Sequence, residues 1–532
     1  AVRTHAAFLV PPPADAARAR LALSGEEVRR HPDFRTILSN GAGAAAQVRL
    51  GWGEIRSQYD ALLAANPNPD VPSDRLNLWT RTRCWLQREG YTRELDRKCV
   101  TRVTVDPAGR FARWDFTAPC GMGKEAAFVF TLSLTPGANA ATLAVTRVTS
   151  GGDDVGDQVR LVFRPDVEWR SFHATTKAFA GPEQLFPASA RAAADGEEGF
   201  DFSPYGQVFA LRVTGGAYHH EPQWTYCVGH PEEAARGQDG SGDLFSPGWI
   251  SADLKVGETV LMEGRLRRNE AARHEGPERR ERPEASSPSR LSCPSSQASQ
   301  SLSPLADALR AALDLYIVKR DDLKTVIAGY PWFLDWGRDT FIFLRGLIAA
   351  GETDIALKIL AAFAAFEENG TLPNIIYGKT AGNRDTTDAQ LWFIRCVQEV
   401  EEWKSGRVEG GKGGKADEWG ETLAALKKTC DSIVDNYLKG TPNGIRVDPG
   451  SGLVWSPSHF TWMDTNYPAC TPRVGYPVEI QALWISALRF LGRDTLADQA
   501  LDSVKRYFKR PSTPHPPSPI PHLSSLTSHP SS

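Results

Sequence analysis

The sequence lacks the features that mark membrane, nucleic-acid or metal-binding proteins. No run of about 18 apolar residues occurs in its 532 residues, so a membrane-spanning helix is not expected. The formal net charge is only −3, without the basic surplus that nucleic-acid binding requires. The eight cysteines include no CxxC pair, and no Cys or His cluster has metal-ligand spacing. We therefore expect no membrane, nucleic-acid or metal partner.

The first residues also lack an initiating Met and a charged-then-apolar signal peptide. Together with the isolated cysteines, this favours an intracellular location, in the cytoplasm or a plastid. The missing Met indicates a fragment, which leaves a lost presequence open. The sequence does not indicate an oligomeric state.

Changes of pattern divide the chain into five segments. Residues 1–84 are mixed, with a helix predicted over 55–65. Short alternating or β-branched runs over 85–266 predict a β-sandwich. The charged, then Ser- and Pro-rich residues 267–304 predict a disordered linker, and residues 510–532 a disordered Pro/Ser tail. A period of 3.6 residues over 305–509 predicts helices at 305–317, 340–350, 353–368, 388–404, 419–438, 477–491 and 494–508.

The densest polar and aromatic group lies in GYPWFLDWGRDTF, residues 329–341, where a loop leads into a helix. The flat faces of Trp332 and Trp336 suit the apolar faces of a sugar ring. The charged Arg338 and Asp339 beside them suit its hydroxyls. The simpler alternative is that Asp339 only caps the helix.

A second group comprises Asn374, Asp385, Asp388 and Trp392. Asp388 stands at the start of an apolar helix, so capping is again the simpler alternative. To act as a general acid it would have to keep its proton, through burial against Trp392 or repulsion by Asp385. The sequence does not decide which aspartate is the acid.

A third group comprises Trp462, Asp464, Arg473 and Glu479. Glu479 fits the first turn of a helix, and for this residue alone we favour the alternative that it complements the helix dipole. All three groups occupy loop-to-helix junctions, which converge on one end of a toroid of antiparallel helix pairs. Such an acidic, aromatic pocket is what glycoside hydrolysis needs, with one carboxylic acid and one further carboxylate.

Five segments in this order resemble the glucosidase domain of glycogen debranching enzymes: AGYPWFLDWGRDTFIFLRGL, GTLPNII, TTDAQLWFI, FTWMD and TPRVGYPVEIQALW. The preceding β-rich part is similar to that of bacterial-type members of the family. The resemblance implies a multidomain β plus α protein, with an N-terminal β-sandwich and an (α/α)6 barrel. It also implies inverting hydrolysis of α-1,6-linked glucose in branched α-glucan such as glycogen, starch or limit dextrin, without metal or cofactor.

The resemblance makes Asp388 the general acid, and Glu479 a pocket residue that holds sugar hydroxyls. Arg338 and Asp339 would bind the terminal glucose, with Trp336 flanking it. We predict substrate contacts from Trp332, Trp336, Arg338, Asp339, Asn374, Asp385, Trp392, Trp462, Asp464 and Arg473.

The sequence departs from the family pattern in two respects. About seven helices are predicted where an (α/α)6 barrel has twelve, so we expect a barrel incomplete at the C-terminus. The family's general base lies in a SEIxDG-like motif, and we find no such motif and no general base. Two alternatives therefore stand beside the α-1,6-glucosidase: a catalytically dead α-glucan-binding protein, and another (α/α)6 exo-α-glucosidase with α-1,4 specificity.

Overall fold

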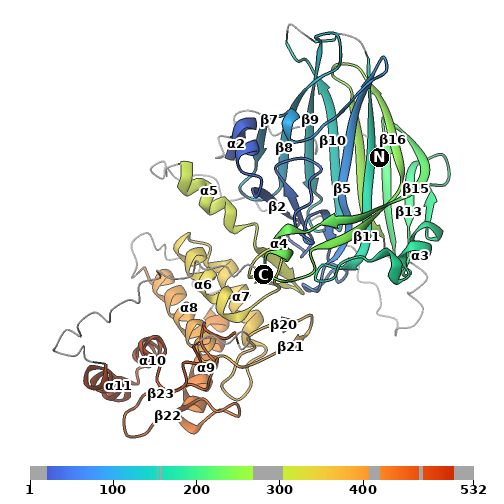
Figure 1. Ribbon diagram of the computed structural model, residues 1–532. Coiled ribbons are helices and arrows are strands. Elements are labelled where there is room, and N and C mark those ends of the chain that lie inside the picture. Colours follow the sequence, from blue (N-terminus) through green and yellow to red (C-terminus); the bar gives the residue numbers. More distant parts are fainter. Residues whose placement is uncertain are drawn as a thin grey trace, which may run out of the picture. The chain divides into compact units, whose positions relative to one another are not determined.

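The computed structural model (Figure 1) describes residues 21–151, 154–155, 158–267, 304–406, 420–465 and 471–508. The predicted tail and all but the first and last residues of the predicted linker lie outside these ranges. The chain divides into two compact units. Unit 1 comprises residues 1–367, 372–384 and 399–426, and unit 2 comprises 368–371, 385–398 and 427–532.

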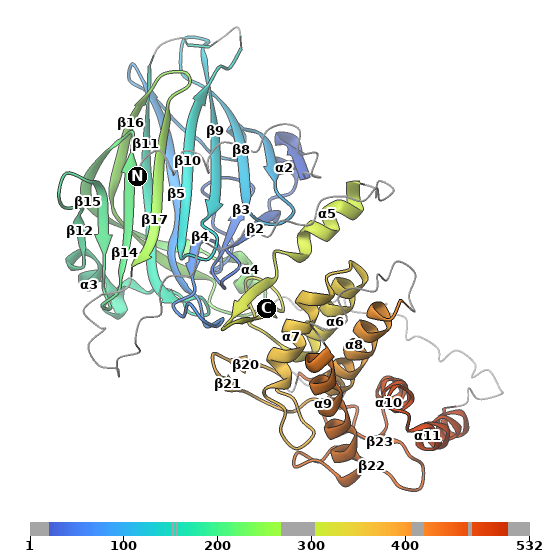
Figure 2. The ribbon, with the colours of Figure 1, turned by 180° about the vertical axis from the view of Figure 1, so that it is seen from behind.

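Residues 21–267, called the sandwich below, form two antiparallel sheets with short helices at their margins (Figures 1 and 2). The nine-stranded sheet runs in the order β1 (Leu21–Ser24), β7 (Val100–Val105), β8 (Phe111–Pro119), β9 (Glu125–Leu134), β10 (Ala140–Val148), β17 (Thr259–Arg267), β14 (Val208–Thr214), β13 (Glu198–Phe202) and β12 (Ala190–Ala192). The eight-stranded sheet runs in the order β15 (Ala217–Gly229), β16 (Ser241–Leu254), β11 (Val159–Ser171), β5 (Leu76–Arg88), β4 (Ala61–Ala65), β3 (Ala45–Arg49) and β2 (Arg35–Ser39), with β6 (Tyr91–Glu94) paired to β5. The short helices are α2 (Gly25–Arg30), α3 (Pro182–Ala188) and α4 (Pro231–Ala234), with 3-10 turns at Arg97–Cys99 and Ala178–Ala180.

Alternation of side chains explains the core between the two sheets. In β8 every second residue, Ala112, Trp114, Phe116 and Ala118, is buried. These side chains join one hydrophobic cluster with residues of the other sheet, such as Leu62 and Phe163. Because side chains alternate between the faces of a strand, the sequence of β8 fixes which face packs inward. The sheet-rich first half, with helices after it, is therefore confirmed.

The helix predicted over 55–65 is wrong. Residues Ala61–Ala65 form β4, a strand between β3 and β5 with all five residues buried. A short apolar run that is buried on both faces has no alternation, so its period does not separate strand from helix. The structure also differs from the predicted boundary at residue 84, since β5 runs through it and β1–β4 pair within the two sheets.

The helical region agrees with the 3.6 period. Its helices are α5 (Pro304–Leu313), α6 (Gly337–Ala349), α7 (Thr353–Ala364), α8 (Asp388–Lys404), α9 (Gly420–Lys439), α10 (Val478–Phe490) and α11 (Asp494–Tyr507). Three hairpins lie between them: β18 (Ile317–Arg320) with β19 (Leu323–Val326), β20 (Ile376–Tyr377) with β21 (Thr380–Ala381), and β22 (Arg446–Val447) with β23 (Val454–Trp455). The first helix ends at Leu313, so residue 317, predicted helical, instead begins a strand. The (α/α)6 toroid stays a prediction.

None of the helices described is both long and apolar enough to cross a bilayer. Across the same described ranges, no group of three or more His, Cys, Asp or Glu residues could hold a metal ion.

Candidate active site

The first predicted group lies where the loop before α6 becomes helix, in unit 1. Trp336 is the N-cap residue, and no side chain caps the helix there. The alternative that Asp339 is the N-cap is therefore wrong: Asp339 is exposed in the first turn, where its charge is stabilised by the helix dipole. Arg338 beside it is 8% exposed. This turn thus presents a carboxylate next to a nearly buried guanidinium.

Asn374 joins this group through the backbone. The Gly337 amide donates to the Asn374 carbonyl at 2.9 Å, and Trp336 forms an antiparallel bridge with Ile375. The side-chain Oδ1 of Asn374 is buried and accepts no hydrogen bond from the residues that the structure describes. The structure therefore places the backbone of Asn374 beside the segment that carries Trp336, Arg338 and Asp339.

A buried ion pair directly before Trp336 was missed in the sequence. Asp335 is fully buried, and its Oδ2 accepts from Arg320 Nε at 2.8 Å and from the Thr325 hydroxyl at 3.0 Å. Burial raises the pKa of Asp335, against the lowering effects of Arg320 and Thr325. The pair ties the loop to the β18–β19 hairpin. The only local signal is an aspartate inside the apolar run Phe333-Leu-Asp-Trp336.

The second group centres on Asp388, in unit 2. Asp388 is the first residue of α8 and only 2% exposed. The Thr386 hydroxyl donates to its Oδ1 at 2.8 Å and accepts from the Ala389 amide at 3.3 Å. Thr386 thus links the helix start to the carboxylate. Asp385, the other candidate acid, is exposed, and Trp392 is half-buried one turn into α8.

Neighbouring residues hold the Asp388 segment in place. The Thr387 amide donates to the Phe460 carbonyl at 2.7 Å, and its hydroxyl lies 2.8 Å from that of Ser456. The Tyr437 hydroxyl donates to the Thr387 carbonyl at 2.9 Å. Burial, and after it the charge of Asp388, hold the pKa of Tyr437 well above its ordinary value. Asp388 and Tyr437 are therefore electrostatic neighbours.

The same contacts bring part of the third group to Asp388. Phe460 lies two residues before Trp462, whose side chain is 58% exposed, and Asp464 is half-buried. The exposed indole of Trp462 is thus on a segment bonded to the one that carries Asp388, and an exposed indole is the kind of surface on which a sugar ring stacks.

Arg473 and Glu479 form an ion pair, with Arg473 Nη2 donating to Glu479 Oε2. Glu479 lies in the first turn of α10, where the dipole alternative puts it. Its other oxygen, Oε1, is buried without a hydrogen-bond partner in the described ranges. Backbone bonds between Ser456 and Gly475, at 2.7 and 2.9 Å, join this segment to the one after β23. Unit 2 thus connects Asp385, Asp388, Trp392, Trp462, Asp464, Arg473 and Glu479 through adjoining segments.

Both halves of the chain match models of one family. Residues 35–261 match the N-terminal domain of glycogen debranching enzyme, and residues 311–512 match amylo-alpha-1,6-glucosidase. The chain belongs to the glycogen debranching enzyme family. The N-terminal match lies within the sandwich, and the glucosidase match covers most of the helical region, including the predicted site residues of both units.

The chain is similar to two known proteins, one compared by sequence and one by structure. Glycogen debranching enzyme of Saccharomyces cerevisiae is 27% identical over 231 residues, a match that covers 33% of this chain and only 15% of the yeast protein. A bacterial glucoamylase solved in complex with acarbose has a TM-score of 0.39 and 9% identity, over 88% of this chain and 65% of the glucoamylase. That the site residues of units 1 and 2 line one pocket stays a prediction.

Proposed function

We propose that this debranching-family chain is a glycoside hydrolase that removes α-1,6-linked glucose from branched α-glucan. The observation that carries the proposal is Asp388, a nearly buried carboxylate that accepts from the Thr386 hydroxyl. Its neighbour Thr387 is joined by a backbone hydrogen bond to the segment of the exposed Trp462. The amylo-alpha-1,6-glucosidase match over 311–512 supports this linkage. No cofactor is needed for such hydrolysis.

In the proposed mechanism Asp388 donates a proton to the oxygen of the departing chain. Proton transfer from a positioned side chain contributes about 10²–10⁴-fold to a rate. Inversion further requires a second carboxylate that takes a proton from the attacking water on the opposite face of the sugar, and the sequence indicates no residue for this role. Within unit 1, Trp336, Arg338 and Asp339 would bind the terminal glucose. Within unit 2, Glu479, which Arg473 orients, would bind sugar hydroxyls.

The test compares Asp388→Asn with wild type on a branched limit dextrin. We expect wild type to release glucose and D388N to lose at least about 100-fold in kcat while its affinity for the dextrin stays within twofold. Asp498→Asn is a matched control, because Asp498 is an exposed aspartate paired with Arg489 on the surface. NMR of the first glucose released should show the β-anomer.

Each other result contradicts a defined part of the proposal. Release of glucose from linear maltooligosaccharides as well would indicate an exo-α-glucosidase of α-1,4 specificity. Dextrin binding without hydrolysis, equal in wild type and D388N, would indicate an α-glucan-binding protein. A wild-type chain that neither binds nor hydrolyses limit dextrin would overturn the α-glucan proposal altogether.

A further inference from the structure

The loop before α6 is held by a side chain of the sandwich, within unit 1. Arg75 stands directly before β5, and its Nη2 donates to the carbonyl oxygens of Pro331 at 2.6 Å and of Phe333 at 3.2 Å. These two carbonyls flank Trp332. One guanidinium nitrogen of the sandwich therefore fixes the backbone on both sides of a predicted sugar-site residue.

The surroundings of Arg75 fix the guanidinium in turn. The side chain is only 1% exposed, and its Cζ lies 4.6 Å from the centre of the Phe172 ring and 5.1 Å from that of Tyr330. Its Nη1 has no partner among the residues described, and Arg75 lines a cavity of about 10 Å³ together with Gln47 and Asn77. That volume is about the room that one water molecule needs. A planar guanidinium can lie over aromatic rings and at the same time donate hydrogen bonds in its own plane, which an ammonium group cannot do.

Two further sandwich side chains contact Trp332 itself. The Tyr59 ring meets the indole edge to face, with centroids 6.4 Å apart, and Arg35 Cζ lies 5.7 Å from the indole centre. Arg35 donates to Glu232 at 3.0 Å. We call Arg35, Tyr59 and Arg75 the loop socket.

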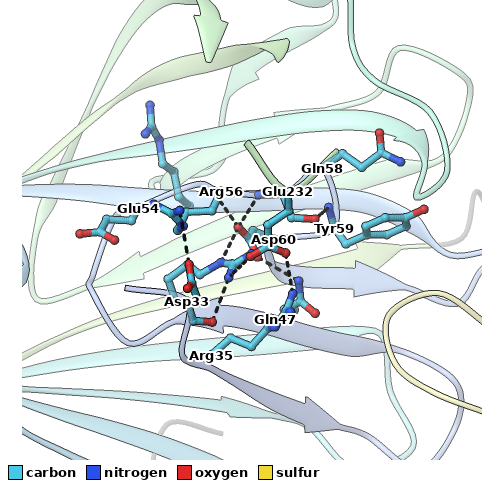
Figure 3. A network of polar contacts seen from close by, with 12 residues as sticks. Asp33, Arg35, Gln47, Glu54, Arg56, Gln58, Tyr59, Asp60 and Glu232 are labelled. Carbon is cyan, nitrogen blue, oxygen red and sulfur yellow. Dashed lines mark hydrogen bonds and ion pairs between the residues drawn. The ribbon is translucent and has the colours of Figure 1, made fainter. Parts of the chain in front are cut away.

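A buried ionic network backs the socket (Figure 3). Asp60 accepts from Gln47 Nε2 at 2.9 Å and from Arg49 Nε, and Arg49 also pairs with Glu232 at 2.6 Å. Figure 3 shows Asp60 among Gln47, Arg56 and Glu232, next to Tyr59 in the chain. Because Arg49 is fully buried and doubly paired, Glu232 is a fixed partner for Arg35.

We propose that Arg75 is a positioning residue for the sugar site: it sets the loop 331–333 and, through Asp335 and its Arg320 anchor, the start of α6. The proposal rests on the proposed function. Only Leu334 separates the carbonyl held by Arg75 from Asp335, and Trp336 follows directly. The bonds of Arg75 and the Arg320–Asp335 pair together fix the backbone of residues 331–335. This fixed backbone positions Trp336, Arg338 and Asp339, which follow it in the chain.

The test compares Arg75→Met and Arg75→Lys with Arg147→Met in the full chain. Arg147 is the control, since it is a fully buried arginine of the sandwich that donates to the Leu254 carbonyl at 2.9 Å and pairs with Asp154 at 3.2 Å, and neither contact reaches the loop. The first measurement is hydrogen exchange at the amides of Trp332, Phe333 and Gly337, which donate to Gly329, Gly329 and Asn374. The second is kcat and KM on limit dextrin.

We expect R75M to exchange these three amides at least about tenfold faster, because local opening no longer breaks the Arg75 bonds. KM should rise about tenfold while kcat changes less, since the loop binds the terminal glucose and does not transfer the proton. R75K should be intermediate, because an ammonium donates to a carbonyl but does not stack between rings. R147M should leave both measurements at wild-type values.

Two outcomes would overturn the proposal. One is unchanged exchange at the three amides in R75M. The other is an equal effect of R147M, which would show a general loss of sandwich stability. If wild type itself neither binds nor cleaves limit dextrin, the proposed function fails, and the exchange data alone still decide whether Arg75 sets the loop.

Discussion

At the scale of single residues, two buried arginines hold the loop before α6 in different ways. Arg320 faces the carboxylate of Asp335, whereas Arg75 faces carbonyl oxygens and aromatic rings. Removing one partner of a buried ion pair leaves an uncompensated charge, which costs more than the pair contributes. The Asp335 site is therefore the more sensitive of the two to substitution.

We predict that Asp335→Asn destabilises the chain by about 3–5 kcal/mol, since Arg320 stays buried without its counter-charge. Urea unfolding followed by tryptophan fluorescence measures the change. Asp494→Asn is the control, because Asp494 pairs with Arg489 in solvent, where a pair contributes at most about 1 kcal/mol. Equal effects of the two substitutions would contradict the role given to the buried pair.

The site residues that the sequence predicts are those whose chemistry is local. Asp388 and Trp336 could be singled out because their neighbours in the chain already suggest a sugar site. Arg75 could not be singled out from the sequence. The carbonyls that it binds lie more than 250 residues further along the chain, and no period or motif connects Arg75 with them. Thr386 was passed over because a threonine before a helix usually means a cap, which is one of the two contacts it makes.

At the scale of elements, periodicity predicted the helices within a few residues but failed for one strand. Helices such as α11 have one buried and one exposed side, so their 3.6 period is visible. The strand β4 is buried throughout and shows no period at all. The two-residue strands β22 and β23 were not predicted either. They are too short for a period and depend on a partner in another element.

That partner is Gln481 on α10. Its Oε1 accepts from the Val454 amide and its Nε2 donates to the Val454 carbonyl, both at 2.8 Å. We predict that Gln481→Ala costs about 1–3 kcal/mol, because both backbone groups of Val454 then lie buried without partners. Exchange of the Val454 amide should become faster, and unfolding in urea should begin earlier.

Gln499 on α11 is the matched control for this prediction. It also donates to two backbone carbonyls, of Pro449 and Gly450, but these bonds are exposed, so water replaces them. Gln499→Ala should therefore change stability by less than about 0.5 kcal/mol. A Val454 amide that exchanges equally in wild type and Q481A would show that α10 does not hold the β22–β23 hairpin.

At the scale of the whole molecule, the sandwich has a core of its own. All members of its large hydrophobic cluster, from Val28 to Met262, lie between residues 21 and 267. The small cluster shared with the helical region takes only Ala45 and the partly buried Ile37 from the sandwich. We therefore predict that a fragment of residues 21–267 folds alone, with a β-type circular dichroism spectrum and one cooperative thermal transition.

A second fragment, residues 85–267, begins at the boundary that the composition suggested and lacks β1 to β4 and most of β5. Because β5 lies between β4 and β11 in the middle of its sheet, this fragment leaves most of one edge of β11 unpaired, with only β16 as a full neighbour, and opens the core. It should aggregate or show no cooperative transition. If both fragments fold equally well, residues 21–84 are not required for the sandwich to fold. If neither folds, the sandwich depends on the contacts that Arg75 and Ala45 make with the helical region.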